Sequence, residues 1–258
     1  MAQAFSRRES HARPSPFYAL TRYMLEAALF VGALWQLSAL WQRPVAGMAS
    51  YFAYAAPALV LVLATAGAAA ATAFAVARAR STGDLEAYVV TPAPTAGIVL
   101  GLGAYPAAGM LLRAVFAYCW MALAGVVPMG WEILATVLSV ALGFAMVPPL
   151  GLLCAAAAVA GRRVLAAAMM LLGAAVVLSG ALFPLATLPE GLRDASLLSP
   201  FRFLVDAVRL CYSGAPPASL LEVWTNLLLW QAVLLPLGWF ALEAAFTSAR
   251  RQGRLRQA

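Results

Sequence analysis

Three charged side chains, Glu26, Arg113 and Glu243, fall inside long apolar runs of this sequence, and Glu243 lies near the end of its run. An ionisable group in an apolar segment is costly to bury, and it is a candidate for function when the segment lies in a membrane. Glu26 lies near the start of its run, close enough to an interface for its carboxylate to reach water. Arg113 lies either at the middle of its run or, if that helix begins later, near one end. A structural ion pair between Glu26 and Arg113 fits both placements, and we expect it before a contact with substrate.

Other residues that carry out chemistry are scarce. All 17 basic residues are arginines, so the chain has neither the lysine of a P-loop nor an amine for a Schiff base. The cysteines, Cys119, Cys154 and Cys211, lack metal-ligand spacing. No Asp, His and Cys cluster suggests a nucleophile or an acid–base pair. We therefore expect no catalytic residue, no metal site and no cofactor bound by this chain.

The composition is typical of a chain that lies in a bilayer. Hydrophobic residues make up 64% of it and charged residues 10%, which is too few to give a soluble core a polar surface. Strand-like alternation is absent, and six apolar runs each supply about the 20 residues of a spanning helix. The sequence predicts an all-α integral membrane protein with six transmembrane helices, at Met24–Trp41, Phe52–Ala77, Ile98–Val127, Ile133–Ala160, Val164–Phe183 and Trp224–Thr247.

The distribution of arginines predicts the orientation. If the N-terminus is cytoplasmic, the inside segments hold Arg7, Arg8, Arg13, Arg22, Arg78, Arg80, Arg162, Arg163, Arg250, Arg251, Arg254 and Arg256, and the outside segments hold only Arg43, Arg193, Arg202 and Arg209. This bias favours two cytoplasmic termini, and an even number of spans agrees with it. We expect a multi-pass protein of the plasma membrane. Because the charges lie at the ends of apolar runs, we expect no nucleic-acid partner.

Three parts follow along the chain. Residues 1–23 are expected to form a cytoplasmic tail and a short interfacial helix at Phe17–Tyr23. Residues 24–247 form the six-helix transmembrane domain, and residues 248–258 form a basic cytoplasmic tail.

A cytoplasmic segment follows the second predicted span. Gly83 can end the preceding helix, and Asp84 can cap a short amphipathic helix that carries Leu85 on one side and Glu86 on the other. Thr91-Pro92 stops that helix, because a proline disfavours helical backbone in the residue before it. An ordinary solvated loop is an equally good interpretation of this pattern.

Between the fifth and sixth predicted spans, an outside segment contains two helix-start signals. Thr187 to Glu190 reads as a capping box with Pro189 early in the helix. Ser199-Pro200 opens a second helix, in which Arg202, Asp206 and Arg209 are spaced to pair along one face. We therefore expect a short helical hairpin on the outer side of the membrane.

These segments resemble the permease (transmembrane) subunits of the type-2 ABC exporter family. GDLEAYVVTP at residues 83–92 is similar to the family's G-T-L-E-x-L-x-V-T-P segment. LFPLATLPEGLR at residues 182–193, followed by LSPFRFLVDAVR at residues 198–209, is similar to its F-P-x-x-x-L-P-x-x-L … x-N-P-x-x-x-x-x-D-A-x-R region. Residues 51–57 resemble the start of its second span. The likeness covers most of the chain in the same order.

The resemblance implies a permease that dimerises with a second copy or a homologous permease, contacts membrane lipids and pairs with separate ABC ATPase subunits, which would bind ATP and Mg. The interfacial helix and the residues Asp84, Leu85, Glu86, Thr91 and Pro92 would couple it to the ATPase. The outer hairpin would help to close the translocation path, with Phe183, Pro184, Leu188, Pro189, Pro200, Phe201, Asp206 and Arg209 as its marker residues.

The cargo is open at this stage. Most of the seven tryptophans lie near span ends, as in an ordinary interfacial belt. This favours a drug-like or lipid substrate over a polysaccharide or glycolipid, which needs a channel lined by aromatic side chains. A membrane scaffold or assembly factor without transport activity is the alternative from another class of protein.

Overall fold

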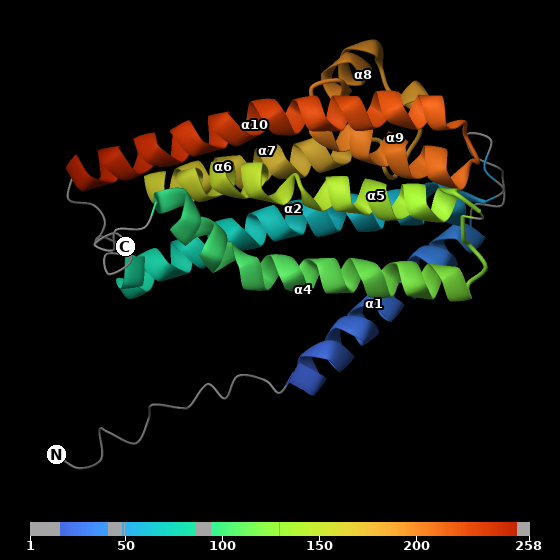
Figure 1. The fold of residues 1–258 in the computed structure, drawn as a ribbon, viewed down its shortest axis with the longest axis horizontal. Coiled ribbons are helices and arrows are strands. Elements are labelled where there is room, and N and C mark those ends of the chain that lie inside the picture. Colours follow the sequence, from blue (N-terminus) through green and yellow to red (C-terminus); the bar gives the residue numbers. More distant parts are fainter. Residues whose placement is uncertain (1–15, 41–47, 49, 86–93, 129, 252–258) are drawn as a thin grey trace.

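In the computed structural model, which describes residues 16–40, 48, 50–85, 94–128 and 130–251, the regular elements are all helices (Figure 1). Four helical stretches of the described chain are long and apolar enough to cross a membrane. They are α2 (Tyr51–Thr82), α4 (Thr95–Leu123), α5 with α6 (Glu132–Phe144 and Val147–Ala160) and α10 (Pro217–Arg251). The predicted all-helical membrane protein is confirmed at this level.

The helix α2 lies at the centre of the bundle. Of its most apolar 18-residue stretch, 67% is buried by the rest of the chain, against 22% for α4 and α10. Its alanines and the glycines that face it allow close approach of neighbouring helices. A Cβ atom on Gly103 of α4 would collide with Thr72 of α2, whose hydroxyl donates to the carbonyl of Ala68 at 3.0 Å. The α2–α4 contact therefore requires glycine at position 103.

The fourth predicted span is interrupted between α5 and α6. Pro148 and Pro149 have no N–H groups, so they cannot donate to the carbonyls four residues earlier. The ladder continues across the break through short turns, with Met146 N–H donating to Gly143 O at 3.1 Å. Gln231 of α10 donates from Nε2 to Leu142 O at 2.8 Å, which satisfies a carbonyl beside the break. Such repair by a neighbouring helix is what makes a break tolerable inside a membrane.

The first helix differs from the prediction. α1 runs without interruption over Pro16–Ala39, so the expected helix end at Tyr23 is wrong, and the position of Phe17–Tyr23 at the membrane interface stays a prediction. No proline or glycine lies near the expected boundary at Tyr23 and Met24, and the Arg22–Glu26 ion pair, 3.1 Å, spans it on one helix face.

The fifth predicted span corresponds to α7 (Arg162–Val177), which has 16 residues. It is shorter than the predicted Val164–Phe183, because Leu178 to Gly180 form a turn in which Gly180 has φ 76°. With α7 this short and α1 less apolar, four of the six predicted spans meet the length and composition of a membrane helix.

Short helices connect α7 to α10. They are the 3-10 turn η1 (Leu185–Thr187), α8 (Glu190–Ser196) and α9 (Pro200–Tyr212). The predicted capping box at Thr187 is wrong: its hydroxyl donates within η1 to Pro184 O at 2.7 Å, and α8 begins after Pro189 without a side-chain cap. α9 begins as predicted, with Ser199 as N-cap and Pro200 first. The Ser199 hydroxyl, however, donates to Ala175 O of α7 at 2.8 Å and so ties the two helices together.

Candidate functional site

The residues predicted to couple to an ATPase lie at the C-terminal end of α2. Gly83 ends this helix in the left-handed region, φ 82°, and its N–H donates to Arg80 O at 3.3 Å. Asp84 is exposed and accepts a hydrogen bond from the Thr82 hydroxyl at 2.7 Å. Leu85 is fully buried in an apolar cluster with residues of α2, α4, α6 and α10, so it anchors this turn to the bundle rather than facing a partner. Glu86, Thr91 and Pro92 lie outside the described residues.

The residues predicted for the outer hairpin fall into two groups. Pro200 and Phe201 are buried in the first turn of α9, and Asp206 and Arg209 are half-buried on the same helix. By contrast, the stretch before α8 is more exposed: its side chains are half-buried or exposed at Phe183, Pro184, Leu188 and Pro189. The α9 helix is therefore part of the packed core, and the η1–α8 stretch covers the surface beside it.

Arg209 is the central polar contact of α9. Its Nη2 atom donates to Gly180 O at 2.6 Å and to Ala181 O at 3.2 Å, and its Nε donates to Tyr54 O at 3.5 Å. The guanidinium carbon also lies 3.7 Å from the centre of the Tyr54 ring. We call this set, Arg209 with Tyr54, Gly180 and Ala181, the Arg209 clamp. It ties α9 to the turn after α7 and to the first turn of α2.

Asp206 forms its ion pair with Arg202 and not with Arg209 of this clamp. It lies 3.8 Å from Arg202, the predicted partner four residues away, in a loose ion pair. Burial raises the pKa of Asp206 above its ordinary value, and the nearby Arg202 and Arg209 only partly oppose that effect. Burial of the ionised Asp206 carboxylate therefore costs solvation free energy.

Glu26 and Arg113 form the ion pair that their positions suggest, with Arg113 Nε 2.7 Å from Glu26 Oε2. The Arg113 guanidinium also lies over the ring of Tyr23, 4.4 Å from its centre. Arg22 is the second cation on Glu26, at 3.1 Å. A carboxylate thus lies between two arginines, with an aromatic ring packed against both of them.

An apolar cavity of about 340 Å³ opens beside this pair. Of the described residues that line it, Glu26 and Arg113 carry the charges, and the others are apolar: Ala27, Phe30, Val60, Leu63, Ala64, Met110, Ala114 and Ala117 from α1, α2 and α4. A predominantly apolar cavity with a few convergent polar groups is the usual form of a small-molecule site.

The depth of the cavity follows from helix geometry. At 1.5 Å per residue, the 32 residues of α2 extend about 48 Å, more than the roughly 30 Å of hydrocarbon in a bilayer. The cavity residues Val60 and Ala64 lie about 14–20 Å from the start of α2 and about 27–33 Å from its end. Arg113 lies about 27 Å from the start of α4. If the roughly 30 Å of hydrocarbon is centred on α2, it extends from about 9 Å to about 39 Å along the helix, so the cavity and its charged pair fall inside it, far from the Gly83 end.

Sequence reasoning missed two polar side chains of α10. Gln231 donates to Leu142 O beside the α5–α6 break, and Trp224 donates from Nε1 to the buried Ser139 hydroxyl at 3.0 Å. Both are uncharged, so a search for intramembrane charges passes over them. A signal for Gln231 was present in the sequence, since an amide among leucines in an apolar helix needs a partner.

The candidate residues thus lie at three levels of α2: the Arg209 clamp at its start, the Glu26–Arg113 cavity within the hydrocarbon depth, and the Asp84 turn at its end. Comparisons with protein-family models, with curated proteins and with solved structures find no match to this chain. The assignment of function therefore depends on the residues and the geometry of the chain itself.

Proposed function

We propose that this chain is the membrane-spanning permease subunit of an ATP-binding cassette exporter, driven by a separate ATPase subunit. The observation that carries the proposal is the arrangement of the two family-like motifs. Gly83, the first residue of the GDLE motif, ends α2, and the region around Arg209 is clamped to Tyr54 at the start of the same helix. One helix, about 48 Å long, thus connects the expected site of the motor to the expected outer gate.

The mechanism follows from this connection. Leu85 fixes the turn after α2 in the core, so a force applied to the exposed Asp84 turn is transmitted to α2 itself. At the other end, the Arg209 clamp makes α9 and the Gly180–Ala181 turn move with Tyr54. A push on the turn by the closing ATPase pair would then reach the segment expected to close the path. Since α1 is one helix whose Tyr23 lies against the middle of α4, at Gly109, we place the contact with the motor in the segment after Gly83 alone.

The cavity beside Glu26 and Arg113 supports a drug-like or lipid substrate. It is of a size for part of an amphipathic molecule, its walls are apolar, and its charges are already paired with each other. An extended polysaccharide would need a continuous row of aromatic side chains, whereas Phe30 is the one aromatic residue that lines this cavity.

The test is reconstitution with candidate ABC ATPase subunits. We expect the wild-type chain to co-purify with one of them and to move a lipid or dye across the bilayer of proteoliposomes only when ATP is present. Glu86→Arg should abolish co-purification and transport. Glu190→Arg reverses the same charge in the exposed first turn of α8, and should leave co-purification intact.

The outcomes separate the candidate functions. Equal binding of the ATPase by both variants would show that the segment after Gly83 does not contact the motor. A wild-type chain that binds no ATPase and moves no substrate, but still co-purifies with other membrane proteins, would identify a scaffold and overturn the exporter.

A further inference from the structure

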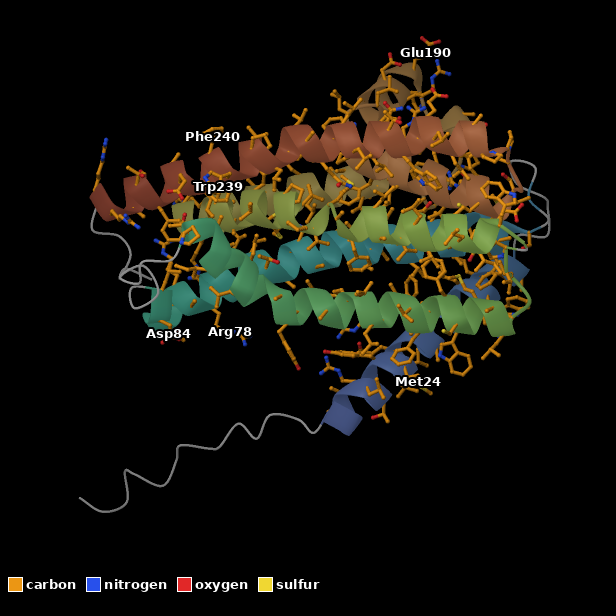
Figure 2. The ribbon with its side chains drawn as sticks, viewed as in Figure 1. Met24, Arg78, Asp84, Glu190, Trp239 and Phe240 are labelled. Atoms are coloured by element: carbon orange, nitrogen blue, oxygen red, sulfur yellow. The ribbon has the colours of Figure 1, made fainter. Side chains whose placement is uncertain are left out.

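A second, larger cavity of about 1100 Å³ lies where the C-terminal part of α2 meets the corner between α6 and α7. The corner is formed by Gly161, which ends α6 and precedes α7 with φ 143°. The cavity lies at the same end of the bundle as Asp84, and Figure 2 shows Arg78, which lines it, at that end. It is separate from the Glu26–Arg113 cavity and plays no part in the mechanism above.

Among the residues that the structure describes, four arginines line this cavity and no acidic residue does: Arg78, Arg80, Arg162 and Arg163. They come from two parts of the chain some 80 residues apart, so the fold brings together two charge pairs that are distant in the sequence. Like charges that line one cavity repel one another, and an anion between them would relieve that repulsion.

The structural part of this group is Arg80. Its Nη1 atom donates to Ala158 O at 3.2 Å and to Val159 O at 3.1 Å, near the C-terminal end of α6. A cation at this position neutralises the negative end of a helix dipole. Arg80 therefore fixes the wall of the cavity and holds α2 against α6.

The other three arginines are available to a ligand. Arg78, Arg162 and Arg163 are exposed, and within the described part of the chain none of their side chains pairs with a carboxylate. Guanidinium groups bind phosphate oxygens with paired hydrogen bonds, which makes arginine the preferred side chain for phosphate recognition. The N–H groups at the start of α7 add to the positive potential of the same wall.

The rest of the lining is apolar and suits a lipid. Phe74 is 55% exposed and Val164 is 49% exposed, and Met169 and Leu165 complete this side of the cavity. Phe74 lies two helical turns before Ser81, so the apolar wall extends from the arginines toward the interior of the bilayer. A phosphate group with acyl chains matches both parts of the cavity, whereas a free phosphate would use only the arginines.

We propose that this cavity binds the phosphate headgroup of an anionic phospholipid through Arg78, Arg162 and Arg163, with the acyl chains against Phe74, Val164 and Met169. This lipid site is independent of the proposed exporter function. Orientation of the chain during insertion requires only that these arginines lie on one side of the membrane. Lipid binding gives them a second role, which depends on their positions in the cavity.

The experiment measures lipid binding to the purified full chain in detergent by native mass spectrometry, with phosphatidylglycerol and phosphatidylcholine as probes. We expect tighter binding of phosphatidylglycerol, weakened by salt. The double variant Arg78→Gln/Arg163→Gln should weaken it roughly 10- to 30-fold, since each arginine near a lipid headgroup contributes a factor of about five. The matched control, Arg250→Gln/Arg251→Gln, removes the same charge from the end of α10 and should change it less than about twofold.

A footprint on the wild-type chain complements the variants, because it does not depend on their folding. Phenylglyoxal modifies accessible arginines, and we expect Arg78, Arg162 and Arg163 to be protected in phosphatidylglycerol nanodiscs but not in phosphatidylcholine nanodiscs. Equal modification in both, or equal loss of binding in the two double variants, would show that the arginines act only as unspecific positive charge. Displacement of the lipid by micromolar inorganic phosphate would identify a soluble ligand and overturn the lipid assignment.

Discussion

Arg113 and Arg209 keep a positive charge inside the packed chain by different means. Arg113 faces the Glu26 carboxylate and the ring of Tyr23, so its charge is balanced by an opposite charge. Arg209 faces backbone carbonyls and the ring of Tyr54, and burial lowers its pKa while Tyr54 and Asp206 act in the opposite direction. The two arginines should respond differently to substitution.

Replacement of Arg209 by lysine is expected to lower the free energy of unfolding by about 1–3 kcal/mol. Lysine keeps the charge, but one ammonium group cannot reach both Gly180 O and Ala181 O while it lies flat on the Tyr54 ring. The measurement is thermal unfolding of the purified chain in detergent. Arg193→Lys, on the exposed face of α8, is the control and should leave the Tm unchanged. A Tm equal to wild type for Arg209→Lys would show that the clamp is held by charge alone.

The Glu26–Arg113 pair should behave as a unit. Glu26→Gln leaves Arg113 within the hydrocarbon depth without its carboxylate, and should destabilise the chain by about 2 kcal/mol or more. The double variant Glu26→Gln/Arg113→Gln should recover much of that loss, with a coupling energy of about 1–3 kcal/mol between the two positions. Additive losses in this double-mutant cycle would mean that the two side chains do not depend on each other.

Arg113 and Arg209 also differ in whether their partners can be predicted from the sequence. Glu26 and Arg113 can be paired from the sequence, because charges are rare in apolar runs and each must find a partner. The partners of Arg209 cannot, because they are carbonyls of Gly180 and Tyr54, which are 29 and 155 residues away. Backbone carbonyls are the same at every position, so only the fold selects them.

At the scale of the helix, the sequence predicted helix ends correctly where a single residue determines the backbone conformation. It predicted them wrongly where a nearby turn uses the same side chain, or where the apolar run continues past the end of the helix. Gly83 ends α2 and Pro200 begins α9 as expected, because glycine permits the left-handed turn and proline fits the first helical position. Thr187 did not cap α8, because its hydroxyl already serves the η1 turn. The short α7 was missed, because the apolar run continues past its last residue, Val177, through a turn.

The packing of α10 on α6 gives a test at this scale. A Cβ atom on Gly238 would lie 2.9 Å from Pro149 O and 3.1 Å from Leu152 Cβ, so Gly238→Ala forces two backbones apart. We expect a loss of about 1–3 kcal/mol in the free energy of unfolding. Gly173→Ala in α7 is the matched control, since nothing lies within 4 Å of the added carbon, and it should be neutral or slightly stabilising. Equal effects of the two substitutions would contradict the close packing of α6 and α10.

The whole molecule has two distinct ends. One carries the Asp84 turn and the arginine-lined cavity, and the other carries α9 and the Arg209 clamp; Figure 1 shows α9 at the opposite end of the bundle from the last turns of α2. Composition and the arginine bias predict such a polarity. They do not predict which helix joins the two ends, and the structure assigns that role to α2.

Cysteine labelling tests this polarity in the membrane. In a Cys119→Ser background, which removes the exposed native thiol, Ala186→Cys should react with an impermeant maleimide in intact cells, whereas Ser81→Cys should react only after permeabilisation. Both positions are exposed, so the difference measures the side of the membrane. Labelling of both in intact cells would contradict opposite placement of the two ends.

The α5–α6 break has a mechanical consequence for a chain of this kind. Bending an intact helix in a bilayer requires hydrogen bonds to be broken where no water can replace them. At Pro148 and Pro149 those bonds are already missing, and Gln231 serves a carbonyl at the break from outside the bent helix. The angle between α5 and α6 can therefore change with little enthalpic penalty, so the bundle contains a compliant joint between these two helices.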